Sequence, residues 1–319
     1  MQPYKKFLLL TVVLLLLLLT MCSRTSDQSK SFRIALVMKA SSNPFFARME
    51  QGARKAADSL QVDLLVGTIT KETDISQQIA IVENMIVQGV KAILIAPADS
   101  KAIINVLKKA QDQGVRIINI DNRIDAAAAK AAGLKIDCYV GVDNEEGGRM
   151  AGEYLVKLLN GRGKVAMLEG IRGVDNAQAR KRGFLKAIEN TQIKLVASQS
   201  ANWAQDQGLD VFANMLQANP DIQGLFCAND MMALGALQAI EQAGKTGKIY
   251  VTSYDNLRAA QQAILEGTLH ATIEQHPEMM GYEGVVLAYQ LLNGQSIPSE
   301  KLVQLDLITR DTLLQAQQK

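Results

Sequence analysis

Polar and aromatic side chains follow several apolar, strand-like segments of this chain, at the points where the segments end. The first segment runs into Lys39, another ends at Asp121, and a later one ends at Asp255. In doubly wound sheets, ligands bind beyond the carboxyl ends of the strands. We therefore expect one binding site, built from these strand ends and the helices that follow them: Lys39, Asn43, Phe45, Phe46, Asp121, Asn122, Arg180, Trp203, Asn229, Asp255 and Gln275.

The charges of these groups indicate a neutral ligand. Asp121 and Asp255 are negative, Lys39 and Arg180 are positive, and the remaining polar groups are amides. An anionic ligand would call for a surplus of Arg or Lys. Carboxylates accept hydrogen bonds, cations donate them and amides do both, while each hydroxyl donates once and accepts twice. The set therefore favours a ligand with several hydroxyls.

Three aromatic rings add flat apolar faces that suit the C–H side of a sugar ring. Trp203, the only Trp of the chain, lies at a strand-to-helix junction and not within an apolar run. This location favours a binding platform over core packing. Phe45 and Phe46 stand at the start of a helix, and we expect one to pack inward and the other to face the ligand.

Catalytic motifs are missing from the sequence. It has no G-x-S-x-G elbow, no H-E-x-x-H and no G-x-G-x-x-G after a strand. His270 and His276 have no Cys or His partner at metal-ligand spacing, so we expect them to be structural. Asp121 with Asp255 as a glycosidase pair is the enzyme alternative, but neither shows the environment of a tuned acid. We expect a protein that is not an enzyme and uses no cofactor and no metal.

Ten short apolar segments alternate with amphipathic helical stretches. Their continuous apolar runs indicate strands that are covered on both faces, as in parallel sheets. Between them, a stretch such as Ile75–Gln88 places apolar residues four, three and four positions apart, on one helix face. Two doubly wound α/β domains are predicted. The strands are expected at 33–38, 62–67, 92–97, 115–121, 139–143, 164–170, 194–201, 224–229, 248–255 and 269–275.

The composition limits the classes of function. A length of 319 residues corresponds to roughly two domains. A net charge of +2, with charges interspersed along the chain, argues against a nucleic-acid partner. Three Cys and two His argue against a disulfide scaffold or a zinc site. Cys138 and Cys227 are expected to be buried, unpaired thiols.

The N-terminus has the pattern of a secretory leader. Lys5 and Lys6 precede an apolar run over 7–19, which is shorter than the roughly 20 residues that a membrane span needs. At the end of the run, Leu19-Thr20-Met21-Cys22 resembles a bacterial lipobox, although Met21 departs from that pattern. We expect residues 1–22 to be a signal peptide with lipidation at Cys22. Ordinary cleavage nearby, or a short uncleaved anchor, are the alternatives.

Residues 23–31 are polar and are expected to form a flexible tether. The leader places the protein in the periplasm or on the outer face of a bacterial membrane, anchored by lipid through Cys22. It also argues against a repressor-type regulator, because a signal segment stands where a DNA-binding helix-turn-helix would precede such a domain.

From Phe32 to about Thr309 the chain resembles the periplasmic sugar-binding proteins of bacterial ABC importers, in the ribose- and allose-binding group. The resemblance covers nearly all of the chain after the leader. The motifs that carry it are Ser42-Asn43-Pro44-Phe45-Phe46, Asn119-Ile120-Asp121, Gly141-Val142-Asp143-Asn144, Ala179-Arg180, Ala201-Asn202-Trp203, Cys227 to Gly235 (CANDMMALG), Ala243 to Gly247 (AGKTG) and Tyr254-Asp255.

The resemblance implies two Rossmann-like domains joined by a three-stranded hinge, the type I periplasmic binding protein fold. It implies an N-terminal lobe of 32–142 plus 276–302 and a C-terminal lobe of 143–275 plus 303–319. Lys39 matches the allose-type pattern in particular. The family's sugar contacts correspond here to Asn43, Phe45, Phe46, Asp121, Arg180, Trp203, Asn229, Asp255 and Gln275.

The chain departs from the ribose-type pattern at informative positions. Asn122 stands where that pattern has Arg, and Trp203 stands where it has Phe. The stretch 122–125 and the insertion through 133–135 look more like allose-type proteins. These differences favour a hexopyranose or a cyclitol over ribose.

The resemblance implies an extracytoplasmic substrate-binding protein. It would close about its hinge on a neutral monosaccharide, such as allose, ribose or a cyclitol, and deliver it to an ABC permease in the membrane. We expect it to act as a monomer. The alternative is a sugar-sensing subunit for a chemoreceptor or a histidine kinase.

Overall fold

A computed structural model describes residues 32–317 of the chain. The predicted signal peptide with Cys22 and the predicted tether lie outside the described residues. Within 32–317, none of the helices is long and apolar enough to span a membrane. The described part contains two six-stranded sheets, each the centre of an α/β domain.

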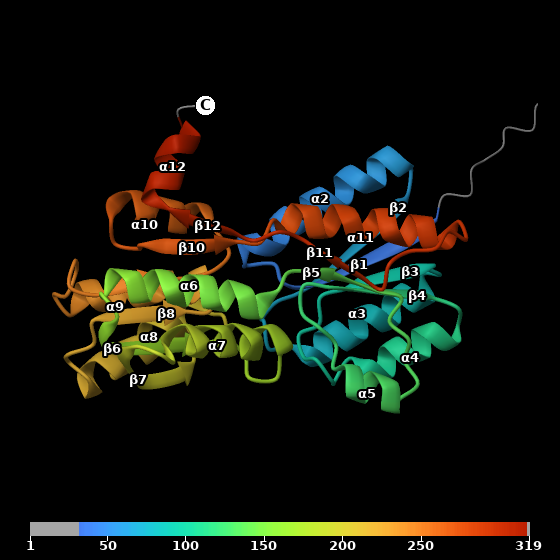
Figure 1. The fold of residues 1–319 in the computed structure, drawn as a ribbon. Coiled ribbons are helices and arrows are strands. Elements are labelled where there is room, and N and C mark those ends of the chain that lie inside the picture. Colours follow the sequence, from blue (N-terminus) through green and yellow to red (C-terminus); the bar gives the residue numbers. More distant parts are fainter. Residues whose placement is uncertain (1–31, 318–319) are drawn as a thin grey trace, which may run out of the picture. The chain divides into compact units, whose positions relative to one another are not determined.

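The first domain is built on the sheet with the strand order β11-β5-β4-β3-β1-β2. Helices α2 (Pro44–Leu60) and α11 (Pro277–Leu292) lie on one side of it, and α3 (Ile75–Val87), α4 (Ile104–Asp112) and α5 (Ala126–Ala131) lie on the other (Figure 1). The strands are β1 (Arg33–Ala40), β2 (Asp63–Ile69), β3 (Ala92–Ile95), β4 (Arg116–Ile120), β5 (Cys138–Gly141) and β11 (Glu300–Leu302).

The second domain is built on the sheet with the order β12-β10-β9-β8-β6-β7. Its strands are β6 (Arg162–Glu169), β7 (Gln192–Ser200), β8 (Gly224–Cys227), β9 (Tyr250–Thr252), β10 (Ala271–Glu274) and β12 (Asp306–Thr309). Its helices are α6 (Asn144–Leu158), α7 (Asp175–Ile188), α8 (Gln205–Ala218), α9 (Asp230–Gln242), α10 (Arg258–Glu266) and α12 (Arg310–Gln317). Helix α6 packs against α7, and α8 packs against α9.

Both faces of the strands are covered, as the continuous apolar runs predict. In β1, Ile34 and Leu36 belong to the core that includes α2, whereas Ala35 and Val37 belong to a second core with α3 and α4. All ten predicted strands are confirmed, with ends that shift by a few residues. Two short strands, β11 and β12, were not predicted. β11 has no apolar pattern, since it is exposed along its whole length.

The chain crosses between the two sheets three times: after β5, after β10, and between β11 and β12. The first two crossings lead into α6 and α11. Because of the third crossing, β12 pairs antiparallel with β10, while the other pairings within the described residues are parallel. The two predicted doubly wound domains are confirmed. The lobe boundaries at 142, 275 and 302 stay a prediction.

The two predicted thiols lie inside the sheets. Cys138 is in β5 and Cys227 is in β8, and both are buried and unpaired, as expected. Burial raises the pKa of both thiols above the usual range for cysteine. A protonated, buried thiol behaves as a small apolar side chain.

Close helix crossings through paired glycines are a repeated device of this fold. A Cβ added to Gly52 in α2 would lie 1.8 Å from the Glu278 carbonyl oxygen of α11, and one on Gly281 would lie 2.0 Å from the Met49 carbonyl oxygen. The pairs α6–α7 and α8–α9 have the same arrangement, through Gly148 with Gly183 and Gly208 with Gly235. At these crossings only glycine lets the two backbones approach so closely.

Replacing Gly52 with alanine tests this packing. The higher helix propensity of alanine favours the change, but the clash is with backbone that cannot rotate away. We expect Gly52→Ala to lower the free energy of unfolding by at least about 2 kcal/mol, as in overpacked cores. Urea unfolding measures it. Gln51→Ala, at the exposed neighbouring position of α2, should change stability by no more than about 0.5 kcal/mol, and an equal loss in both variants would contradict this account.

Candidate ligand-binding site

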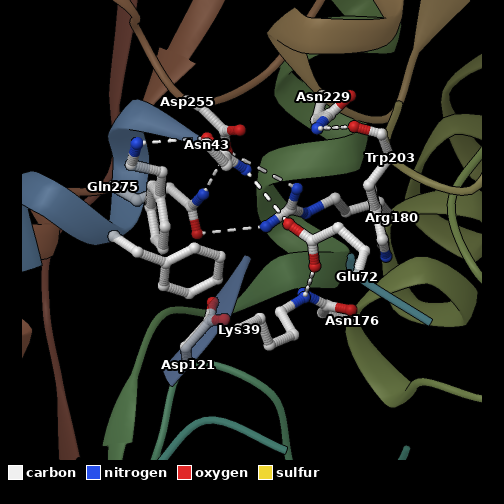
Figure 2. Close-up of a pocket in the computed structure, with 12 residues that line it drawn as sticks. Lys39, Asn43, Glu72, Asp121, Asn176, Arg180, Trp203, Asn229, Asp255 and Gln275 are labelled. Carbon is white, nitrogen blue, oxygen red and sulfur yellow. Dashed lines mark hydrogen bonds and ion pairs between the residues drawn. The ribbon is translucent and has the colours of Figure 1, made fainter. Parts of the chain in front are cut away.

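A small polar cavity lies where strands of both sheets end (Figure 2). The lining side chains leave only a small volume between them, about 20 Å³. Ten of the eleven predicted binding residues line it. The first domain contributes Lys39, Asn43, Phe45, Phe46, Glu72 and Asp121, and the second sheet with its helices contributes Asn176, Arg180, Trp203, Asn229, Asp255 and Gln275.

The start of α2 positions one wall of the cavity. Asn43 is the N-cap of this helix, and its side-chain oxygen accepts a hydrogen bond from the Phe45 backbone N–H at 3.1 Å. Pro44 at the first helical position favours a helix start here. The rings of Phe45 and Phe46 meet edge to face, with centroids 5.2 Å apart. Both rings are buried and both line the cavity, so the expected division, with one ring packed inward and the other facing the ligand, is not seen.

Lys39 and Glu72 form a buried ion pair in the same wall. The Lys39 ammonium lies 3.2 Å from the Glu72 carboxylate, and the Lys39 side chain is 4% exposed. The ammonium also lies over the rings of Phe46 and Trp203, 5.4 and 5.5 Å from their centroids. The register of β1 against β2 shifts between Val37 and Ala40, and such irregularities often re-aim a side chain beside a site.

Asp121 follows β4 directly and has a left-handed backbone, with φ at +61°. The Tyr139 hydroxyl donates a 2.7 Å hydrogen bond to the Asp121 carbonyl oxygen, which holds this turn. The residue is 3% exposed, and within residues 32–317 its carboxylate receives no hydrogen bond and forms no ion pair. Burial raises the pKa of Asp121, although Lys39 and Arg180 act in the opposite direction. The carboxylate is therefore available to a ligand.

Arg180, on α7, is the best-connected group of the cavity. Three of its five N–H groups donate to protein acceptors: Nε to the Asn144 side chain at 2.8 Å, Nη1 to the Ala228 carbonyl oxygen at 2.8 Å and Nη2 to the Gln275 side chain at 3.1 Å. The guanidinium also lies 3.7 Å from the Tyr254 ring centroid. Two N–H groups remain for a ligand.

Asp255 and Gln275 complete this network. The Gln275 amide donates to the Asp255 carboxylate at 2.6 Å, and Arg180 Nη1 lies 3.7 Å from the same oxygen (Figure 2). Burial, as the largest cause, raises the pKa of Asp255 well above the usual range, while Arg180 acts in the opposite direction. The Asp255 carboxylate is thus oriented before any ligand arrives.

Trp203 is seated against backbone. A Cβ on Gly170, which follows β6, would lie 2.0 Å from the Trp203 ring, so only glycine leaves room for it. The Asn229 amide donates to the Trp203 carbonyl oxygen at 3.3 Å, and its side-chain oxygen caps α9. The ring is buried and its face is turned toward the Lys39 ammonium.

Two polar atoms of the cavity wall have neither a hydrogen bond nor an ion pair within the described residues. They are the Trp203 indole N–H, which can only donate, and the Asn176 side-chain oxygen, which can only accept. A buried polar group without a partner costs about 1–3 kcal/mol. A ligand that both accepts and donates hydrogen bonds would relieve both.

Backbone strain is concentrated at this cavity. Asp121, Trp203 and Asp255 all have positive φ, at 61°, 65° and 116°. Such conformations cost of order 1–3 kcal/mol for residues other than glycine. They aim the side chains of strand-end turns into one space, and surrounding packing must hold them there.

Asn122 is the predicted residue that does not line the cavity. Its side chain is fully buried and donates a 2.8 Å hydrogen bond to the Pro97 carbonyl oxygen, in the turn after β3. It thus supports the turn that carries Asp121. The strand-end rule identified the correct turn but not the direction of each side chain in it.

Two cavity residues were not predicted. Glu72 lies three residues beyond the end of β2, so the strand-end rule applied to that strand would have found it. Asn176 stands four residues before Arg180 on α7, a spacing that shares one helix face. With Glu72 the cavity holds three carboxylates and two cations, so the predicted balance of charge does not hold when all are ionised. Because burial raises the pKa of both Asp121 and Asp255, the count of carboxylates does not by itself set the net charge of the cavity.

The two histidines lie outside the cavity lining. His270 accepts a hydrogen bond from the Val251 N–H at 3.1 Å. His276 bonds Asp306 at 2.7 Å, which links the second and third crossings. Within residues 32–317, no group of three or more His, Cys, Asp or Glu side chains could hold a metal ion.

Asp230 supports the cavity from behind. It is fully buried next to Asn229 and accepts hydrogen bonds from the Ser253 hydroxyl, from the Thr272 hydroxyl at 2.8 Å and from the Leu257 N–H at 2.7 Å. These bonds join the ends of β8, β9 and β10. Burial raises the pKa of Asp230 to about 7.

Two α/β domains that enclose a small, polar, partly aromatic cavity define a ligand-binding protein. The chain belongs to the periplasmic binding protein domain family, which it matches over residues 34–296. This is a family of binding proteins, in agreement with the prediction that the chain is not an enzyme.

Similar proteins are known from several bacteria. The D-ribose/D-allose-binding protein of Pseudomonas aeruginosa is 42% identical over 84% of this chain and 85% of its own length. The ribose import binding protein RbsB of Escherichia coli is 35% identical over 87% and 90%. The crystal structure of an ABC transporter periplasmic solute-binding protein from Actinobacillus succinogenes with bound D-allose has a TM-score of 0.84 and 43% identity, and covers 89% of this chain and 100% of that one.

The raised pKa of Asp230 predicts a pH dependence of stability. An unfolded Asp titrates near 3.9, so between about pH 4 and 7 the folded protein binds more protons than the unfolded one. The free energy of unfolding should therefore fall as pH rises through this range. Asp230→Asn removes this contribution, and we expect a shallower slope in urea unfolding between about pH 4.5 and 7.5.

The matched control is Asp221→Asn. Asp221 is exposed, and its hydrogen bond with Lys164 lowers its pKa, so it titrates below this range. The free energy of unfolding of Asp221→Asn should change with pH as steeply as that of the unaltered protein. A slope that is the same in Asp230→Asn would show that Asp230 does not hold its proton in the folded state.

Proposed function

We propose that this protein is an extracytoplasmic substrate-binding protein that captures a neutral monosaccharide between its two domains for an ABC importer. The observation that carries the proposal is the small cavity, whose wall combines carboxylates, cations, amides and aromatic rings from both domains. Periplasmic binding protein membership supports a role in binding and not in catalysis.

The hydrogen-bonding capacity of the wall suits a polyol. Asp121 accepts, Arg180 has two free N–H groups, and Lys39 has donors beyond the one that faces Glu72. Hydroxyl groups that donate to a carboxylate and accept from a cation satisfy both at once. The Trp203 face suits the apolar side of the ring.

We infer a ligand of the ribose and allose type, with a hexose such as allose favoured and a cyclitol as a further candidate. Both relatives and the neighbour with bound D-allose support this class. The ribose-type pattern has Arg at the position of Asn122. The Asn122 side chain is turned away from the cavity and bonds Pro97, which supports a site different from that of ribose-type proteins.

Closure about the three crossings would bring the two walls onto the sugar. A ligand that touches both domains binds the closed state better than the open one, and this difference shifts the population. In our proposal the lobes comprise 32–142 with 276–302 and 143–275 with 303–319. The burial of Lys39, Asp121 and Arg180 supports closure, because these charges would be solvated in an open cleft.

The proposal includes an extracytoplasmic location, in the periplasm or on the outer face of a bacterial membrane, and a monomeric protein. Lipidation at Cys22 would anchor the chain, with 23–31 as a tether. The closed form would deliver sugar to the membrane permease. Recognition of the closed form by a chemoreceptor or sensor kinase is the alternative. Uptake of labelled sugar by cells that lack the protein separates the two roles: lost uptake supports import, and unchanged uptake supports sensing.

Loss of either of two cavity groups should abolish binding. Asp255→Ala removes an acceptor that Gln275 and Arg180 hold in place, and Trp203→Ala removes the platform. We expect isothermal titration with D-allose, D-ribose and myo-inositol to detect heat for the unaltered protein and none for either variant. Tyr250→Ala, at an exposed position outside the cavity lining, should titrate normally. Unchanged binding by either cavity variant would refute the assignment.

A matched pair of asparagines separates binding from support of the fold. Asn176→Ala removes an unpartnered acceptor from the wall, so we expect about tenfold weaker sugar binding with little change in the ligand-free melting temperature. Asn122→Ala loses its bond to Pro97 instead, and should lower the melting temperature with a smaller effect on affinity. Calorimetric titration and thermal melts of both variants check this. A lower melting temperature in Asn176→Ala with a larger loss of affinity in Asn122→Ala would contradict the two roles.

A further inference from the structure

Ser100 joins the two domains at a point outside the cavity lining. It lies in the turn between β3 and α4 and is 6% exposed. Its backbone N–H donates to the Gly173 carbonyl oxygen at 3.2 Å, and its hydroxyl oxygen accepts from the Asp175 N–H at 3.0 Å. Gly173 lies between β6 and α7 of the second domain, and Asp175 is the first residue of α7.

Ser100 is also fixed within its own domain. Its hydroxyl donates to the Arg123 carbonyl oxygen at 2.7 Å, and its carbonyl oxygen accepts from the Asp125 N–H at 2.8 Å. Both partners belong to the turn that begins at Asp121. The hydroxyl thus acts as donor to one domain and acceptor from the other.

The two segments that meet at Ser100 are those that carry cavity residues. On one side is the turn of Asp121. On the other is the first turn of α7, whose next residues include Asn176 and Arg180. Bonds between Ser100 and this helix start can form only when the two domains are close together.

We propose that Ser100 is a positioning residue that sets the affinity for every ligand of this cavity by stabilising the closed state, without touching the ligand. The proposal rests on the proposed function, since it needs a sugar that binds by closure. The apparent dissociation constant is the intrinsic one divided by the fraction of competent, closed protein. A contact that favours closure therefore tightens binding of all sugars by one common factor.

Two variants remove the same bond from opposite sides. Ser100→Ala removes the acceptor. Asp175→Pro removes the donor and also turns the proline ring, in place of the amide hydrogen, toward the Ser100 hydroxyl oxygen. It should fold because Asp175 is the first residue of α7, where proline is favoured and no helical bond needs this N–H. Val174 before it is extended, with φ −112° and ψ 138°, as a residue preceding proline prefers.

We expect Ser100→Ala to bind D-allose and D-ribose about tenfold more weakly, or ~1.4 kcal/mol, and Asp175→Pro at least as weakly, with the ratio of the two affinities unchanged and dissociation faster. The double variant should bind about as weakly as Ser100→Ala, because the bond is already lost and the alanine leaves room for the proline ring. Asp175→Ala keeps the N–H and should bind normally. Ser100→Thr keeps the hydroxyl and should restore most of the affinity.

The outcomes separate the two proposals. Unchanged affinity in Ser100→Ala, a change that differs between sugars, or an equal loss in Asp175→Ala would overturn the role of Ser100 and leave the proposed function intact. A lower melting temperature without a change in affinity would assign Ser100 a merely structural role and also overturn it. If the unaltered protein binds no monosaccharide, the proposed function fails, and the role of Ser100 fails with it.

Discussion

The buried guanidinium of Arg180 is the interaction on which the rest of the binding region depends. A charge that is 2% exposed is tolerable only if its donors and its charge are matched. Its acceptors come from the start of α6, the end of β8 and the end of β10, and Asp255 supplies the opposite charge after β9. The Arg180 side chain, from α7, therefore connects these four segments and keeps two N–H groups free.

The same constraint applies to the whole cavity. Three carboxylates and two cations are enclosed there, and Lys39 with Glu72 and Arg180 with Asp255 offset part of the cost of burial. Asp121 stays without such a partner among the described residues, and its turn, like those of Trp203 and Asp255, has a strained backbone. The close helix crossings and doubly covered sheets provide the packing that holds these turns. A polyol would supply the hydrogen bonds that the protein itself leaves unmade.

Much of this arrangement follows from local patterns. Apolar runs predict ten strands, and the rule that ligands bind at strand ends assigns Lys39, Asp121 and Asp255 to one site from the sequence alone. The rule works because parallel strands all end at one edge of the sheet. It did not predict that the Asn122 side chain faces Pro97 and not the cavity. This outcome depends on φ and on neighbouring turns, which no local pattern specifies.

By itself, the sequence determined the two α/β domains, the strand ends that carry the cavity and the buried state of both thiols, because apolar periodicity and strand order act locally. Only the tertiary structure decided the excess of carboxylate, through the approach of Glu72 to Lys39, and the meeting of Ser100 with the start of α7. Both involve segments far apart in the chain, and their distance is set by how sheets and domains pack, a property that residue type and spacing do not contain.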